Sequence, residues 1–168
     1  LIAQTLHLFG NMSSFRGNLI EALNYKLQAS KLFEEVSNES MVRFLQMQIG
    51  WIYYEIGEYK KALDYYNRKL IIDEKRGNKN SISNDFTNIG LVYFQQEDYN
   101  KAVEYLDKSA TMQMEREAKM TLETASHLFL SKKILGKEYN VEEIHTLIKE
   151  QEEIDDYINF ALFKLLDE

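Results

Sequence analysis

The sequence contains no cysteine and no proline, and only 7 of its 168 residues are glycine. Without cysteine there is no disulfide, thiolate metal site or cysteine nucleophile, and the sequence does not indicate whether the protein resides in a reducing or an oxidising compartment. A cytoplasmic location is compatible with this composition and is what we expect. Proline and glycine interrupt regular structure. Their scarcity, with 45% hydrophobic residues, favours helices joined by short turns over a sheet-rich fold.

Basic charge is also scarce, because 20 Lys and Arg stand against 27 Asp and Glu, for a net charge of −7. The resulting field repels phosphate backbones and anionic membranes, so we expect no nucleic acid among the partners. No apolar stretch approaches the ~18 residues that a spanning helix needs. No basic leader precedes an apolar run either, so we predict no membrane insertion.

Patterns that carry chemistry are missing as well. His7, His127 and His145 have no metal-ligand spacing, and the glycines are singletons rather than a phosphate loop. The acidic runs, Glu34-Glu35 and the stretch from Glu150 to Asp156, place carboxylates next to one another in sequence, which spreads them around a helix as a solvated face. We therefore predict no catalytic residues, no metal, no cofactor and no enzyme activity.

A repeat of 40 residues is present. It spaces Gly10, Gly50 and Gly90, and it also spaces Ala22, Ala62 and Ala102. Tyr53 and Tyr93 match between the second and third copies. Within each copy, apolar residues recur at intervals of three and four, so each copy is predicted to be two amphipathic helices.

The repeat predicts a single all-α array over residues 1–168. Its copies cover approximately 1–38, 39–78, 79–117 and 118–153, followed by an orphan helix at 154–168. First helices are expected near 2–14, 40–56, 81–96 and 119–135, and second helices near 19–34, 59–75, 99–115 and 141–152. Turns fall at 56–59 and 96–99, where glycine or a short acidic residue ends one helix and caps the next. Asn140 and Glu143 form the expected cap of the last second helix.

The motif Ile49-Gly50-x2-Tyr53 followed by Ala62-x3-Tyr66 resembles the signature of the tetratricopeptide repeat family. The third copy repeats it around Gly90 and Ala102, whereas Lys26 and Leu130 depart from it in the first and fourth. The resemblance implies a right-handed α-solenoid of antiparallel helix pairs, a superhelix with protein or peptide partners. The long period is similar to Pins-type adaptors, kinesin light chains and bacterial sensor arrays, including Rap-type peptide-pheromone receptors.

In this family the first helices line the concave face, and by register the ligand would meet twelve positions. They are His7, Asn11, Phe44, Met47, Gln48, Trp51, Tyr54, Asn84, Thr87, Asn88, Leu91 and Gln95. Almost all are uncharged, which predicts a neutral peptide held by amides and anchored by aromatic side chains. Two alternatives stay open: Trp51 packs between repeats, or Asn88 bonds a neighbouring helix. Family members that clamp a chaperone's carboxylate need basic groups where His7, Asn84 and Thr87 stand, so a clamp is disfavoured.

The last helix is apolar nearly all round, so we expect something to cover it: further repeats of a longer protein, an output domain, or a second copy in a homodimer. The leading hypothesis is a non-catalytic binding scaffold or sensor region of a larger signalling protein. The first alternative is a structural module that pairs arrays. The second is an intracellular pheromone receptor that holds an apolar peptide with Asn88 and Gln48.

Overall fold

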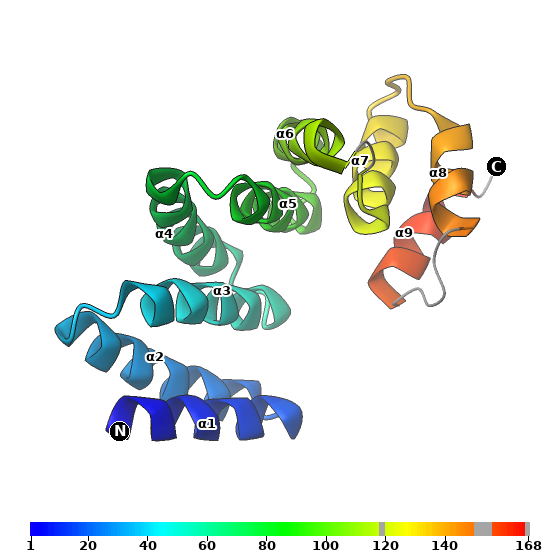
Figure 1. The fold of residues 1–168 in the computed structure, drawn as a ribbon. Helices are drawn as coiled ribbons and strands as arrows, with labels where there is room; N and C mark the ends of the chain where they lie inside the picture. Colours follow the sequence, from blue (N-terminus) through cyan, green and yellow to red (C-terminus); the bar gives the residue numbers. More distant parts are fainter. Residues whose placement is uncertain (118–119, 150–155, 167–168) are drawn as a thin grey trace. The chain divides into compact units, whose positions relative to one another are not determined.

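The computed structural model describes residues 1–117, 120–149 and 156–166, and all regular structure in these ranges is α-helix (Figure 1). The expected all-α fold of helix pairs is therefore confirmed. The chain forms two compact units, 1–76 and 77–168, which are taken separately below. The acidic stretch 150–155, the expected helix end at 152 and the expected helix start at 154 lie outside the described residues.

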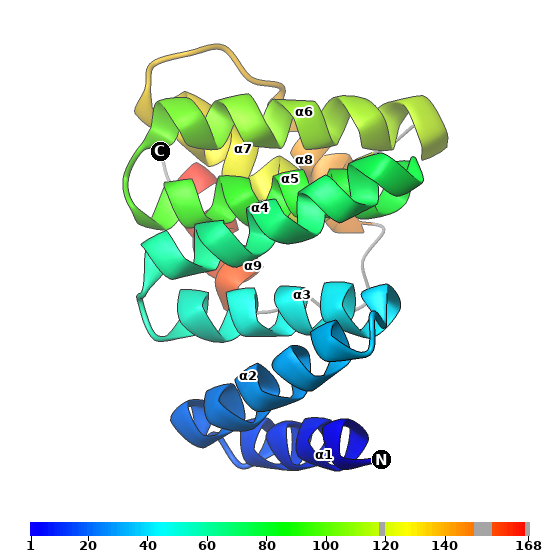
Figure 2. The same cartoon turned by 90° about the vertical axis from the view of Figure 1, so that its left-hand side faces the viewer.

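Unit 1 consists of α1 (Ile2–Phe15), α2 (Leu19–Glu35), α3 (Glu39–Glu55) and α4 (Tyr59–Arg76), each within about two residues of its predicted bounds. Figure 2 shows α2 crossing between α1 and α3. The core of unit 1 contains Ala22, Leu45, Ile49 and Ile52, and the side chains of these four residues are fully buried. The three-and-four spacing of these residues puts them on one stripe of each helix.

Local chemistry ends and starts the helices where the sequence predicts. Gly57 adopts φ +77°, a left-handed conformation that glycine reaches without steric cost, and lets the chain reverse after α3. The side chain of Asn38 accepts a hydrogen bond from the backbone N–H of Met41 at the start of α3. In the other unit, Asn140 accepts from the backbone N–H of Glu143, so the cap expected there is confirmed.

The repeated small residues mark the closest approach of the paired helices. A Cβ added to Gly50 would lie 2.7 Å from a ring carbon of Tyr66, and one added to Gly90 would lie 2.7 Å from Cγ of Leu106. These two partners each stand four residues after the repeat alanine, and Ala62 and Ala102 are themselves fully buried. Glycine and alanine therefore recur because the helices of a pair leave no room for a larger side chain.

The repeat tyrosines fill the space beside this contact. The ring of Tyr53 lies 5.5 Å from the ring of Tyr65, and the ring of Tyr93 lies 5.5 Å from the ring of Tyr105, centroid to centroid. Aromatic rings at this separation attract one another beyond their buried area. The second and third repeats thus use the same ring pair to lock their two helices together.

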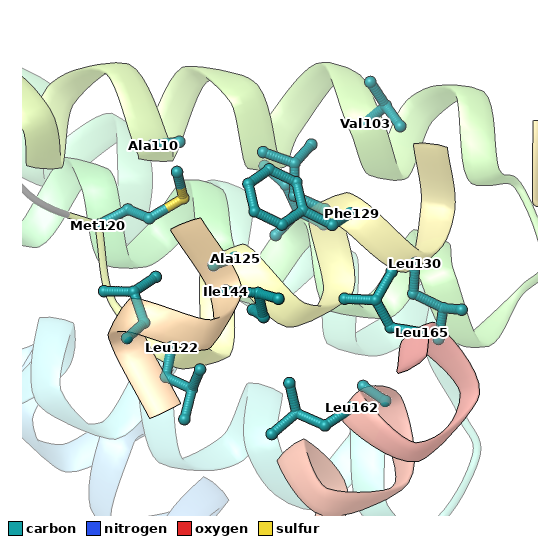
Figure 3. Packing of buried hydrophobic residues seen from close by; sticks show 14 of the residues in the cluster. Val103, Ala110, Met120, Leu122, Ala125, Phe129, Leu130, Ile144, Leu162 and Leu165 are labelled. Carbon is teal, nitrogen blue, oxygen red and sulfur yellow. The ribbon is translucent and has the colours of Figure 1, made fainter. Parts of the chain in front are cut away.

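Unit 2 consists of α5 (Lys79–Gln95), α6 (Tyr99–Glu117), α7 (Leu122–Ile134), α8 (Val141–Lys149) and α9 (Asp156–Leu166). Helix α7 is buried on nearly all sides and contacts each of the other four helices (Figure 3). This explains the departure at Leu130, which is buried in the same core as Leu165 of α9 rather than at a close helix crossing. The fourth repeat is irregular because its first helix is the centre of a core.

The last helix is expected to need a cover for its apolar surface, and the core around α7 supplies part of that cover for α9. Ala161, Leu162 and Leu165 are buried in the core around α7, whereas Phe163 is 64% exposed. The chain itself therefore covers one face of the helix.

Candidate functional site

Seven of the expected ligand-contacting residues lie on α1 and α3 of unit 1, and we call them the unit-1 face. They are His7, Asn11, Phe44, Met47, Gln48, Trp51 and Tyr54. Phe44 is 39% exposed and Trp51 is 42% exposed, and the other five are half-buried. Because Phe44, Gln48 and Trp51 follow one another at steps of four and three residues, they form one stripe along α3. Large aromatic side chains left this open are candidates for anchoring a ligand.

The two helices of the unit-1 face are joined by aromatic and polar contacts. The ring of His7 on α1 meets the ring of Phe44 on α3 edge to face, with centroids 5.7 Å apart. Nδ2 of Asn11 donates to Nε2 of His7 over 3.1 Å. Burial, and then the positive charge of Lys26, lower the pKa of His7, which keeps the imidazole neutral and able to accept this bond.

Sequence reasoning did not include Lys26 among the site residues, yet its ammonium group joins the two helices from beneath. Lys26 belongs to α2 and is only 2% exposed. Its Nζ donates to Oδ1 of Asn11 over 2.6 Å and to Oε1 of Gln48 over 2.9 Å. A Cβ added to Gly10 would lie 2.9 Å from Cγ of Lys26, so the lysine stem packs where Tyr66 packs in the next repeat.

Burying this ammonium is unfavourable, and desolvation lowers the pKa of Lys26 from its usual 10.5 to about 8. In the described part of the chain, no carboxylate lies within ion-pair distance of it. The signal that identifies Lys26 is in the sequence: a lysine stands four residues after Ala22, where the second and third repeats have Tyr66 and Leu106.

A second buried lysine in the same unit shows the contrast. Nζ of Lys69, which is 5% exposed, lies 2.7 Å from Oδ2 of the fully buried Asp73. The other oxygen of Asp73 lies 2.8 Å from the guanidinium of Arg43 on α3. Here the protein provides the carboxylate that a buried cation requires. At Lys26 only neutral amide oxygens take that role.

The other five expected residues lie on α5 of unit 2. Asn84 is exposed, and Asn88, Leu91 and Gln95 are half-buried. The expected ladder of Gln48 and Asn88 would join residues of different units and stays a prediction.

Thr87, expected on the same face, is instead buried at 4% exposure. Its hydroxyl lies 2.7 Å from Oγ of Ser109 and 3.0 Å from Oγ1 of Thr124, which ties α5 to α6 and α7. These bonds satisfy Thr87 internally, so we leave it out of the proposed binding surface.

Over the described residues, no group of three or more His, Cys, Asp or Glu side chains is arranged to hold a metal ion. None of the described helices combines the length and the apolar character needed to cross a membrane.

Comparison with known families agrees with the helix-pair geometry. Two family models described as tetratricopeptide repeat match the sequence, one over residues 1–75 and the other over residues 86–116. The chain belongs to the tetratricopeptide repeat family, whose helix pairs form protein-binding scaffolds. A search of curated proteins finds no match.

Several solved structures share the fold. BtubC (BKLC) from P. vanneervenii is 15% identical with a TM-score of 0.73, and the match covers 95% of this chain and 64% of that one. The apo form of RapI is 18% identical with a TM-score of 0.79, covering 90% and 44%. PH0952 from Pyrococcus horikoshii, a signal transduction ATPase with numerous domains and a tetratricopeptide repeat sensor, is 22% identical with a TM-score of 0.71, covering 93% and 25%.

The chain spans less than two thirds of each of these three proteins. At identities this low, the likeness establishes the fold and leaves function to the arrangement of individual side chains.

Proposed function

We propose that this chain acts by binding a segment of another protein on the unit-1 face, as the recognition region of a larger protein, and not by catalysis. One observation supports this most directly: two large aromatic side chains, Phe44 and Trp51, stay about two-fifths exposed on a face whose other residues, apart from Met47, carry polar groups. Exposing such side chains forgoes burial free energy, and binding a partner recovers it.

The polar groups between the aromatic side chains suit an extended peptide. Gln48 lies between Phe44 and Trp51 on the α3 stripe, and Lys26 holds its amide oxygen. An ammonium group only donates hydrogen bonds, so the atom of Gln48 that faces it is the oxygen, and Nε2 stays available. Within the described residues Nε2 has no partner, and it is not among the buried unpaired atoms. It can therefore donate to a carbonyl oxygen of a ligand.

A peptide-display library panned against the whole chain tests this proposal. We expect enriched peptides to bind the wild type and to lose binding to the Phe44→Ala, Trp51→Ala double variant. The matched control is Ile71→Ala, which removes an apolar side chain of α4 that is 52% exposed and lies outside the unit-1 face. Enriched peptides that bind all three chains equally, or the absence of enrichment, would contradict the proposal.

Pairing of arrays is the second candidate, and the outer surface of α1 favours it. Ile2, Leu8, Met12 and Phe15 are 71%, 59%, 50% and 95% exposed, which leaves a large apolar surface on this helix. Light scattering over a range of concentrations tests it, since Leu8→Ser with Phe15→Ser should convert a dimer to a monomer. A wild type that is monomeric throughout would exclude this candidate.

A further inference from the structure

The feature of unit 1 that the binding proposal leaves unexplained is the ammonium group of Lys26. Its two partners, Asn11 and Gln48, are both neutral, and the equivalent positions of the next repeats hold Tyr66 and Leu106. A buried cation without a carboxylate destabilises a fold, and an apolar residue fits this position twice in the same chain. A residue that departs from the pattern of its repeat and lowers the stability of the fold is typical of a functional site.

The surroundings of Lys26 indicate what would compensate for this cost. The ammonium lies directly beneath the amide of Gln48, which belongs to the unit-1 face, and 2.9 Å separates Nζ from Oε1. Its positive charge polarises that amide, so Nε2 of Gln48 becomes a stronger donor toward whatever lies above it. A charged acceptor there would also interact with the ammonium of Lys26 itself, a residue that is only 2% exposed.

Resting on the proposed function, we infer that the unit-1 face selects a ligand carboxylate, which accepts from Nε2 of Gln48 above Lys26 while apolar neighbours in the ligand contact Phe44 and Trp51. Lys26 is then a specificity-determining residue that acts through Gln48. This differs from the neutral peptide that the residues of the face alone predict. It also needs no basic side chain on the first helices, because the positive charge comes from a second helix.

The test uses the fluorescence of Trp51, which is the single tryptophan of the chain. Three acetylated nonapeptides are titrated into the whole protein at pH 7: one centred on Leu-Asp-Leu with an amidated end, its Leu-Asn-Leu counterpart, and the Asn peptide with a free C-terminal carboxylate. We expect the Asp peptide to bind about tenfold more tightly than its Asn counterpart. The third peptide shows whether a chain terminus can supply the carboxylate instead.

Two variants separate the role of Lys26 from general charge and from folding. Lys26→Met should abolish the preference for Asp over Asn, whereas Lys31→Met, which removes an exposed lysine of the same helix, should retain it. Gln48→Glu keeps the ammonium and supplies a carboxylate from the chain itself. It should also abolish the preference, because the Nε2 donor is lost, and it tests the carboxylate inference if Lys26→Met does not fold.

The pH dependence of the preference gives a readout that a purely structural role would not change. The preference should disappear between pH 7 and pH 10, as the ammonium of Lys26 loses its proton with a pKa of about 8. His7 is the titratable group that faces Lys26 from α1, and its lowered pKa keeps it neutral throughout this interval.

The outcomes are distinguishable. Equal binding of the Asp and Asn peptides by the wild type overturns the carboxylate inference and leaves the proposed function standing. A preference that survives Lys26→Met overturns the role of Lys26. If no peptide changes the fluorescence of Trp51, the proposed function and this inference fall together.

Discussion

Replacing Lys26 with methionine should leave the free energy of unfolding at pH 7 nearly unchanged, although the substitution removes two hydrogen bonds. Methionine has nearly the same length and flexibility, so its side chain can follow the lysine stem over Gly10. What changes is the buried charge.

The magnitude follows from the pKa of Lys26. A group whose pKa is lower in the folded chain binds its proton more weakly there, so the charged form opposes folding below the folded value. The opposition is relieved as the pH rises from about 8 toward 10.5. The lowering corresponds to roughly 3 kcal/mol at about 1.4 kcal/mol per pKa unit. Losing the two hydrogen bonds that the ammonium donates to Asn11 and Gln48 costs about 1.5 kcal/mol each, so the two effects nearly cancel at pH 7.

Urea unfolding followed by the helical circular dichroism signal, at pH 7 and at pH 10, measures this directly. We expect Lys26→Met to be about as stable as the wild type at pH 7, and about 2 kcal/mol less stable than the wild type at pH 10. Lys31→Met, on the exposed side of α2, should differ little from the wild type at either pH. A stability difference between Lys26→Met and the wild type that is the same at both pH values would refute the account of Lys26 as a destabilising buried cation. So would a loss of more than about 2 kcal/mol at pH 7.

Three further substitutions test the packing and the face. Gly50→Ala places a Cβ 2.7 Å from the ring of Tyr66, so the free energy of unfolding measured by urea titration should fall by about 1–3 kcal/mol. An unchanged free energy of unfolding would mean that the two helices are not closely packed at this point. Asp73→Asn leaves the buried ammonium of Lys69 beside a neutral amide, so the free energy of unfolding measured by thermal denaturation should fall by about 3 kcal/mol. A fall of less than about 1 kcal/mol would show that this ion pair contributes little to stability. Trp51→Ala should change stability by less than about 1 kcal/mol, because the indole is 42% exposed, yet weaken peptide binding at least about tenfold in a direct binding assay. Strong destabilisation with unchanged binding would indicate that Trp51 serves the core instead.

The sequence by itself determined the helices and their pairing. Helix ends depend on residues within a few positions of one another, as in the cap formed by Asn140 and the reversal at Gly57, so local chemistry is sufficient to predict them. The close approach of paired helices also has a local signature, since glycine and alanine recur at a fixed spacing wherever bulk is excluded. The 40-residue repeat, which assigned the chain to the tetratricopeptide repeat family, adds these local signals together.

Only the tertiary structure decided what each side chain meets. Lys26 reaches Asn11 and Gln48, which are 15 and 22 residues away, and Thr87 reaches Thr124, which is 37 residues away. The helical period predicts which face of its helix a residue occupies. The burial of its side chain depends also on how the helix is rotated and on which neighbouring helix covers that face. The unit-1 face was therefore predictable as a stripe of residues. The charge beneath it was visible in the sequence only as a lysine that departs from the repeat. Its contacts were not predictable, because Lys26 comes from another helix and its side chain packs against Gly10 to reach Asn11 and Gln48.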